Sequence, residues 1–165
     1  MSVEIAPLRA DDWASVREIY REGIATGNAT FETDAPSWEA WNAAHLAIGR
    51  LLARIDGRIA GWIALSPVSE RCVYAGVAEL SVYVASSARG HGVGKALLEA
   101  AIADAERAGI WTLQSGTFPE NAASIALQKA CGFREVGRRE GLGKMNGRWR
   151  DVVLLERRSR LAGAD

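Results

Sequence analysis

Residues 82–95 have the sequence VYVASSARGHGVGK, and this stretch decides what kind of fold the chain can adopt. It begins as an apolar strand, passes through a turn with glycine at every second position, and continues as an amphipathic helix to about residue 108. Glycine lacks a Cβ, so such a turn can bend tightly and approach a ligand closely. The helix after it presents unpaired N–H groups and the positive end of its dipole. These features predict a phosphate-binding site, beside which Arg89 and Lys95 add positive charge.

Two well-known phosphate loops do not fit this turn. A Walker loop needs glycine and serine or threonine where the chain has Arg89 and Ala96. The dinucleotide fingerprint needs the spacing G-x-G-x-x-G, whereas the glycines here stand at 90, 92 and 94, and no run of β-α-β units precedes them. The alternative is an ordinary glycine-rich turn, but the strand before it and the helix after it favour a phosphate loop.

The flanking sequence predicts an α/β fold with the order β-α-α-β-β-β-α-β-α-β-β, a mixed sheet with helices packed against it. Asp11 or Asp12 is expected to cap the first helix and Ser37 the second, which runs to about residue 48. The Asp56-Gly57 pair between two apolar runs predicts a β-hairpin. Strands are expected at 3–8, 50–55, 59–65, 77–85, 110–115, 133–138 and 149–155, and further helices at about 92–108 and 121–131. With no repeat or linker, residues 1–165 are expected to form one domain.

The composition excludes several classes of protein. Twenty Lys and Arg balance twenty Asp and Glu, whereas a nucleic-acid-binding domain usually has a basic excess. Two cysteines and two histidines make a metal site unexpected. Cys72 and Cys131 also lack the His and acid partners of a nucleophilic triad. No apolar run reaches about 18 residues, and the N-terminus has no secretory signal, so a cytoplasmic protein that does not span a membrane is expected.

Five blocks of the sequence resemble the GNAT acetyltransferases. The Arg-x-x-Gly-x-Gly pattern at 89–94, after a Val-Tyr-Val strand, is similar to the coenzyme A pyrophosphate loop of that superfamily, and residues 121–127 followed by Gly132-Phe133 look like its second block. Residues 29–32, 78–84 and 147–152 resemble the phosphinothricin acetyltransferase branch. The likeness follows nearly the whole chain in order. It implies a V-shaped split between the strands at about 77–85 and 110–115, with acetyl-CoA lying in it.

Glu79 is the candidate general base for acetyl transfer to an amine. An α-amino group has a pKa near 8, so at neutral pH most of it is protonated, and a base speeds its reaction. Strand alternation places Glu79 on one face with Val77, Ser81 and Tyr83. A carboxylate in so apolar a strand is costly unless it is paired or hydrated, and the structural alternative is a glutamate in a salt bridge or facing water. The resemblance implies the catalytic role.

The resemblance also implies the remaining site residues. Backbone groups would hold the pantetheine arm and polarise the acetyl oxygen at Val82, Tyr83 and Val84. The pyrophosphate would lie against Arg89, Gly90, His91, Gly92, Val93, Gly94 and Lys95. Asn121 would bond to the cofactor arm and Ser124 would lie near the sulfur; the alternatives are a plain helix cap and a solvent-facing hydroxyl. The expected acceptor-binding residues are Phe31, Glu32, Arg71 and Trp149, the last with simple packing as its alternative.

Three departures from the family pattern concern catalysis. Many members have tyrosine, and the phosphinothricin branch histidine, where this chain has Gln128. Because an amide does not ionise, the leaving thiolate would take its proton from water or leave as the anion. Leu80 replaces a histidine that usually follows the catalytic glutamate. Ala75 replaces an arginine, for which Arg71 is a possible substitute.

The predicted function is direct transfer of acetyl from acetyl-CoA to the amine of a small amino-acid-like acceptor of the phosphinothricin or methionine sulfoximine/sulfone type. The alternatives are acetylation of a peptide or protein N-terminus, and a non-catalytic acyl-CoA sensor. Loops 26–36 and 66–76 are expected to decide the acceptor. The resemblance further implies a homodimer.

Overall fold

The computed structural model describes residues 2–165, and the strands within this range form one seven-stranded mixed sheet. Its spatial order is β1-β2-β3-β4-β5-β7-β6, and β4 and β5 are its one parallel pair. The predicted α/β class and element order are confirmed. The strands are β1 (Glu4–Pro7), β2 (Leu51–Ile55), β3 (Arg58–Pro67), β4 (Val77–Val84), β5 (Thr112–Thr117), β6 (Arg134–Met145) and β7 (Arg148–Arg158).

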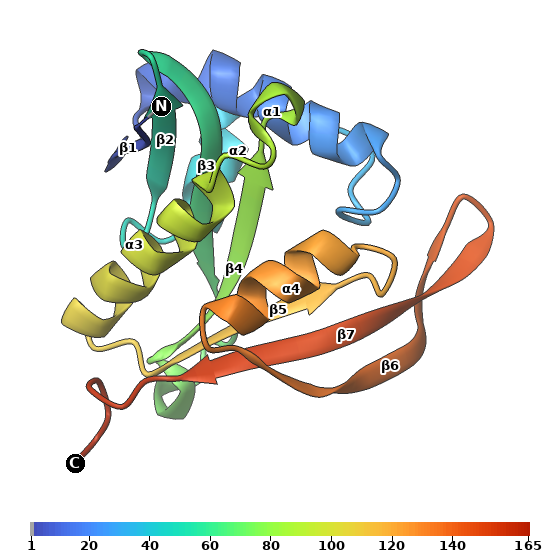
Figure 1. Cartoon of the computed structure of the whole chain (residues 1–165). Helices are drawn as coiled ribbons and strands as arrows, with labels where there is room; N and C mark the ends of the chain where they lie inside the picture. Colours follow the sequence, from blue (N-terminus) through green and yellow to red (C-terminus); the bar gives the residue numbers. More distant parts are fainter. Residues whose placement is uncertain (1) are drawn as a thin grey trace.

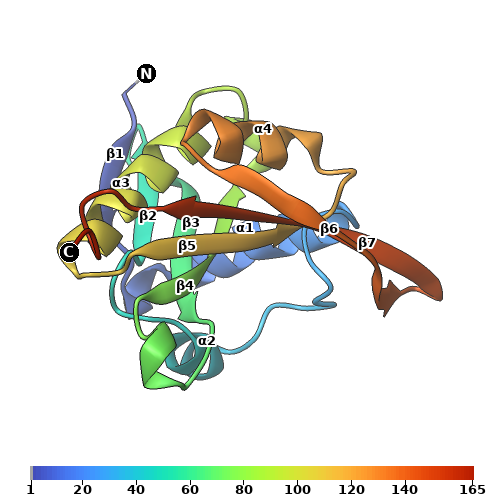
Figure 2. The same ribbon diagram turned by 90° about the horizontal axis from the view of Figure 1, so that it is seen from below.

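Helices cover both faces of this sheet (Figures 1 and 2). The helices are α1 (Trp13–Ala25) and α2 (Trp38–Ala44) on one face, and α3 (Val93–Arg107) and α4 (Ala122–Ala130) on the other. Two successive residues of β3 show the alternation. The ring of Trp62 packs against Tyr20 of α1 and Trp41 of α2. A Cβ added to Gly61 would instead meet Val93 of α3 at 2.9 Å, so α3 lies close against the sheet at this glycine.

The β2–β3 hairpin has the predicted turn. Ile55 pairs with Arg58 across the two residues Asp56 and Gly57, whose φ angles are 49° and 78°. Left-handed angles at both central positions give the turn a twist that matches the strands, and Asp-Gly is a favoured pair for it. Turn chemistry therefore determines this hairpin.

Three sequence expectations about element ends are wrong. The Asp12 side chain does not cap α1: it accepts the Arg9 N–H at 2.9 Å and pairs with Arg54 at 3.1 Å. Ser37 caps α2 by accepting the Ala40 N–H, but the helix ends at Ala44 rather than near residue 48, because His45 is extended. Strands β6 and β7 also run well beyond the predicted ranges of 133–138 and 149–155.

The His45 ring is expected to make the stability of the fold depend on pH. It stacks on Trp41, and its Nδ1 lies 2.7 Å from the Trp41 carbonyl oxygen. Burial lowers the pKa of His45 from 6.5. As the pH falls through 6.5 toward the lower pKa of the folded state, His45 binds a proton more readily in the unfolded chain than in the folded one. The free energy of unfolding therefore decreases as the pH falls. We expect urea unfolding to show lower stability at about pH 5.5 than at pH 8. The difference should shrink in His45→Gln but persist in His91→Gln, which removes an exposed histidine; equal differences in both variants would contradict the assignment.

Strands β4 and β5 separate soon after they begin. Their parallel pairing covers only Val77 with Thr112, Ala78 with Leu113, and Glu79 with Gln114. Beyond Glu79 the two strands diverge, as Figure 1 shows, and the sheet opens. The V-shaped split expected between these two strands is thus present, and its apex lies at Glu79.

Candidate active site

The backbone of β4 lines one side of this split with free polar groups. The Ala85 N–H donates to the Ala60 carbonyl on the β3 side at 2.8 Å. Backbone direction alternates along an antiparallel strand, so Tyr83 also turns its N–H and C=O toward β3, whereas Leu80, Val82 and Val84 turn theirs toward β5. Since β5 has diverged there, these groups face the split. Of the three residues expected to contribute backbone groups, Val82 and Val84 turn theirs into the split, whereas Tyr83 turns its backbone toward β3 and lines the cavity with its ring.

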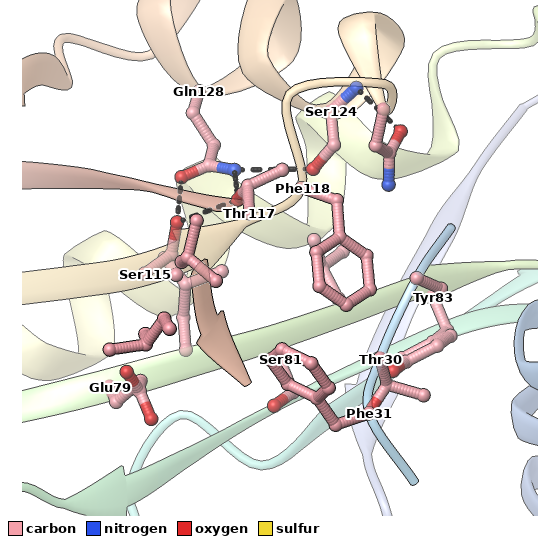
Figure 3. Close-up of a pocket in the computed structure, with 17 residues that line it drawn as sticks. Thr30, Phe31, Glu79, Ser81, Tyr83, Ser115, Thr117, Phe118, Ser124 and Gln128 are labelled. Atoms are coloured by element: carbon pink, nitrogen blue, oxygen red, sulfur yellow. Dashed lines mark hydrogen bonds between the residues drawn. The ribbon is translucent and has the colours of Figure 1, made fainter. Parts of the chain in front are cut away.

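A cavity of about 320 Å³ occupies the split (Figure 3). Glu79, Ser81 and Tyr83 line it from β4, Ser115 and Thr117 from β5, and Gln128 from α4. The Tyr83 ring packs on Tyr20 of the α1 face, whereas Ser115 and Thr117 bond to α4 on the other face. The cavity therefore connects the two faces of the sheet. Its lining consists of Ala29, Thr30, Phe31, Glu79, Leu80, Ser81, Val82, Tyr83, Ser115, Gly116, Thr117, Phe118, Asn121, Ser124, Gln128, Leu142 and Val152.

Glu79 is the one charged side chain in this lining. It is partly exposed. Within residues 2–165 no ion pair or side-chain hydrogen bond involves its carboxylate, so the salt-bridged alternative does not hold. Hydration from the cavity remains as the way to offset its desolvation. A carboxylate that is accessible and free of competing cations can accept a proton from a bound ammonium group.

A second cavity, of about 520 Å³, follows the glycine turn into α3. Gly90 and Gly92 have φ angles of 80° and 78°, which side chains rarely adopt. The first helical bond runs from the Ala96 N–H to the Gly92 carbonyl, so the N–H groups of residues 93–95 have no partner within the helix. Arg89 and Lys95 line the same cavity. His91 is exposed and lies outside both linings.

Gly94 brings α3 and α4 close together beside this cavity. A Cβ at this position would lie 2.8 Å from Leu127 of α4. Val84 of β4 and Ser124 of α4 also line the cavity. Gly94 therefore allows close packing of the two helices, whereas Gly90 and Gly92 allow the left-handed backbone of the turn.

Asn121 and Ser124 lie where the two cavities meet, since both residues line both cavities. The Asn121 Oδ1 accepts the Ser124 N–H at 3.3 Å and caps α4. This cap uses only the amide oxygen, so the Asn121 amide can donate elsewhere. The two cavities also share Ala29, Val82 and Tyr83, and together they form one continuous cleft.

Tyr83 keeps its hydroxyl neutral. Its ring stacks on Trp62 and packs on Tyr20. Burial, followed by the nearby Tyr20, raises the pKa of Tyr83 well above its usual value of 10.0. A phenol that holds its proton this strongly is not a general base at neutral pH. In the cleft Tyr83 therefore serves as an apolar wall with a neutral hydroxyl.

The expected acceptor-binding residues divide into two groups. Phe31 lines the first cavity and meets Phe118 edge-on, with ring centroids 4.9 Å apart. Glu32, Arg71 and Trp149 lie outside both linings. Arg71 stacks on Tyr74, and Trp149 is 66% exposed. Two loops were expected to determine which acceptor binds. Loop 26–36 lines the cleft, whereas loop 66–76 does not.

Sequence reasoning missed Leu142, which reaches the cavity through a break in the β6–β7 pairing. Arg139 pairs with Val152 and Gly143 with Arg150, so the residues between Arg139 and Gly143 bulge out of the ladder. The Asp151 carboxylate stabilises the bulge by accepting the Gly141 N–H at 2.8 Å. Bulges commonly redirect a side chain near a site. The glycines at 141 and 143 are the sequence signal that could have indicated it.

Sequence reasoning also missed Arg150 of β7. Its side chain holds the loop of residues 26–36, which lines the cleft, in place through hydrogen bonds. Its guanidinium donates to the Gly27 carbonyl at 2.8 Å and to Asn28 Oδ1 at 2.9 Å. It also pairs with Glu120 at 3.2 Å and lies 4.1 Å from the centroid of the Phe118 ring. One side chain thus joins β7 to the two loops that carry Phe31 and Asn121.

Replacing Arg150 with methionine should loosen this loop. Met keeps most of the apolar stem but removes the hydrogen bonds to residues 27, 28 and 120. We expect the KM for a substrate bound in the first cavity to rise about tenfold with a smaller change in kcat, because these charge-assisted hydrogen bonds position the cavity wall. Faster limited proteolysis within residues 26–36 should accompany it. Arg148→Met, an exposed arginine two residues away on the same strand, is the control, and equal behaviour of both variants would contradict the assignment.

The described residues contain neither a membrane-spanning helix nor a cluster of metal ligands. Among residues 2–165, no helix is long and apolar enough to cross a membrane. The same residues contain no group of three or more His, Cys, Asp or Glu side chains placed to hold a metal ion.

Comparisons with known proteins extend over almost the whole chain. The model of the acetyltransferase (GNAT) family matches residues 13–133. A phosphinothricin N-acetyltransferase of Alcaligenes faecalis is 34% identical over 157 residues, 91% of this chain and 79% of that protein. An L-methionine sulfoximine/L-methionine sulfone acetyltransferase of Pseudomonas paraeruginosa is 28% identical over 94% of each. The crystal structure of a GNAT superfamily phosphinothricin acetyltransferase from Sinorhizobium meliloti in complex with AcCoA has a TM-score of 0.88 at 30% identity, covering 100% of this chain and 92% of that one.

Proposed function

Since the chain belongs to the GNAT family of acetyltransferases, we propose that it transfers the acetyl group of acetyl-CoA directly to the primary amine of a small amino-acid-like acceptor. One observation carries the proposal. A cavity built from a glycine turn and a helix N-terminus continues, at Val82, Asn121 and Ser124, into a cavity whose one charged side chain is Glu79. A thioester bound along the glycine-turn cavity would thus present its acetyl group beside the Glu79 carboxylate.

The donor half of the cleft suits a pyrophosphate and an extended arm. The unpaired N–H groups of residues 93–95, the positive end of α3, Arg89 and Lys95 all favour an anion there. The backbone groups that Leu80, Val82 and Val84 turn into the split can pair with the amides of a pantetheine arm, much as a further strand would. A β4 N–H at this position can also donate to the acetyl oxygen as negative charge develops on it.

In the acceptor half, Glu79 is the proposed general base. It would accept the proton of the acceptor ammonium group, after which the neutral amine attacks the thioester carbonyl carbon. The C–N bond forms, the C–S bond breaks, and the electron pair leaves with sulfur as the CoA thiolate. The nitrogen loses its second proton to water in the cleft, which leaves the neutral amide. The loop fastened by Arg150 would exclude water, and Phe31, Phe118 and Leu142 would provide apolar walls for the acceptor side chain.

Free-thiol release from acetyl-CoA tests the proposal directly. Phosphinothricin, methionine sulfoximine and methionine sulfone are the first acceptors to test, because the two relatives described above are named as acetyltransferases of these compounds. Turnover with one of them is the expected result. Turnover only with a peptide carrying a free N-terminus would move the acceptor to the second predicted class. Binding of acetyl-CoA with no turnover on any amine would overturn catalysis and favour a sensor.

We also propose that residues 1–165 form a single domain that assembles as a cytoplasmic homodimer. Strands from residue 4 to residue 158 share one sheet, which supports the single domain. Strand β6 forms an edge of the sheet and exposes Val136 and Leu142 by 44% and 48%, which supports association through this edge. Sedimentation equilibrium should give twice the chain mass of 17.7 kDa, and a monomer mass would exclude the dimer.

A further inference from the structure

Gln128 is buried in the wall of the cleft, and every polar atom of its amide is engaged. Its side chain is 1% exposed in the last turn of α4. Its Oε1 accepts a hydrogen bond from the Ser115 hydroxyl. Its Nε2 donates to Thr117 Oγ1 at 3.0 Å and to Ser124 Oγ at 3.2 Å. Figure 3 shows these four side chains together on the side of the cavity opposite Glu79 and Ser81.

The directions of these bonds determine where each hydroxyl hydrogen goes. The Ser115 hydroxyl has one hydrogen, which it donates to Gln128 Oε1. In the 3.2 Å contact between the Ser115 and Thr117 hydroxyls, Thr117 is therefore the donor. Both of these hydrogens thus stay inside the network. Ser124 receives a hydrogen bond from Gln128 Nε2, and none of the hydrogen bonds among residues 2–165 uses the hydrogen of its own hydroxyl. Ser124 lines both cavities, so this hydrogen is available where they meet.

We propose that Gln128 is a positioning residue that holds the Ser124 hydroxyl as hydrogen-bond donor to the sulfur of CoA while the thiolate leaves. The inference rests on the proposed acetyl transfer. The C–S bond breaks with its electron pair going to sulfur, and the Ser124 O–H donates to that negative sulfur without giving up its proton. The acceptor ammonium group gives one proton to Glu79 and its second proton to water. The thiolate then takes a proton from water after the transfer. Gln128 thereby contributes without ionising.

A hydrogen bond to a charged group is worth enough to affect both rate and equilibrium. Loss of the donor should lower kcat about 10- to 100-fold, with little change in the KM for the acceptor. It should also raise the pKa of the bound CoA thiol, because the donor favours the thiolate over the thiol. The second readout needs no acceptor, so it stays measurable if the acceptor is outside the panel.

The test compares the affinity for CoA with the affinity for S-methyl-CoA from about pH 6 to pH 9.5, by titration calorimetry. The pH dependence of the ratio reports the pKa of the bound thiol. Titratable side chains facing the two cavities are Glu79, Tyr83, Arg89, Lys95 and Glu120. S-methyl-CoA experiences the same side chains but has no thiol, so the ratio cancels their titration.

Four variants separate the roles. Ser124→Ala should raise the bound thiol pKa by about one unit, the equivalent of the tenfold effect, and Ser124→Thr should restore it. Gln128→Met keeps most of the volume but removes the amide, so nothing holds the Ser124 hydroxyl in place, and the thiol pKa should shift in the same direction as in the alanine variant. Ser87→Ala, an exposed serine, is the matched control and should leave the pKa unchanged.

Each other result overturns part or all of the proposal. An unchanged thiol pKa in both Ser124→Ala and Gln128→Met would exclude Ser124 as the donor. A shift in Ser124→Ala alone would exclude the positioning role of Gln128. If the wild-type protein binds neither CoA nor S-methyl-CoA, the proposed function itself fails and this inference with it. Binding with the expected shifts but no turnover on any amine would leave the Ser124 assignment supported and overturn only the proposed catalysis.

Discussion

The variant Glu79→Gln is expected to lower kcat by a hundredfold or more at neutral pH, because a positioned general base typically contributes about 10²–10⁴ in rate. Glutamine has nearly the shape of glutamate, and no ion pair of Glu79 would be broken by the change. The KM for acetyl-CoA should therefore change little, since the glycine turn is untouched. Raising the pH should restore part of the lost rate, because solvent then deprotonates the amine before it binds.

Steady-state thiol release with the best acceptor of the panel is the measurement. Glu39→Gln, an exposed glutamate of α2, is the control for the loss of one charge. Turnover that survives Glu79→Gln with an unchanged pH profile would remove this carboxylate from the mechanism. In that case a water molecule or another group in the cavity would accept the proton. The next residues to substitute would be those of the loop that carries Thr30.

The largest effect on stability is expected from Trp62→Ala. Trp62 is 1% exposed at the centre of β3, where its ring contacts Tyr20, Trp41 and Tyr83. Removing so large a buried ring should cost about 3–5 kcal/mol and lower the Tm by roughly 10 °C. Because Trp62 stacks on Tyr83, with ring centroids 4.9 Å apart, the wall of the cleft should also loosen and the KM for acetyl-CoA should rise.

Two matched variants make this prediction specific. Trp62→Phe keeps an aromatic ring, and it removes an indole N–H that is buried without a hydrogen-bond partner among residues 2–165, so its cost should be clearly smaller. Trp149→Ala removes a tryptophan that is 66% exposed and should leave the Tm within about one degree. Thermal unfolding followed by circular dichroism measures all three. Similar losses for Trp62→Ala and Trp149→Ala would contradict the core assignment.

Where local chemistry determines the backbone, the sequence was sufficient to predict it. The Asp56-Gly57 turn, the Ser37 cap and the glycines at 90 and 92 each need a particular residue type for a particular φ or hydrogen bond. Alternation in residues 77–84 likewise placed Glu79, Ser81 and Tyr83 on one face. These predictions rest on properties of one or two residues, which is why they could be made without knowledge of tertiary contacts.

The remaining features depend on contacts between distant residues. Helix α2 ends early because His45 turns back to the Trp41 carbonyl, which the helical pattern through residue 48 does not reveal. The β6–β7 hairpin turns at Asn146-Gly147, a recognised turn pair, but the charged and glycine-rich residues of β6 show no apolar alternation. Arg150 became a site residue only because it bonds to residues 27 and 28, more than a hundred positions away.

The divergence of β4 from β5 should also be visible in amide hydrogen exchange. The amides of Tyr83 and Ala85 turn toward β3, where the Ala85 N–H bonds to Ala60, so they should exchange slowly at all times. Those of Val82 and Val84, one residue away in each case, open onto the split and should exchange fast in the free protein. Saturating CoA should slow only this second set. Within a single strand, alternate residues would then report whether the cleft is filled, and exchange could screen for donors without any chemical turnover.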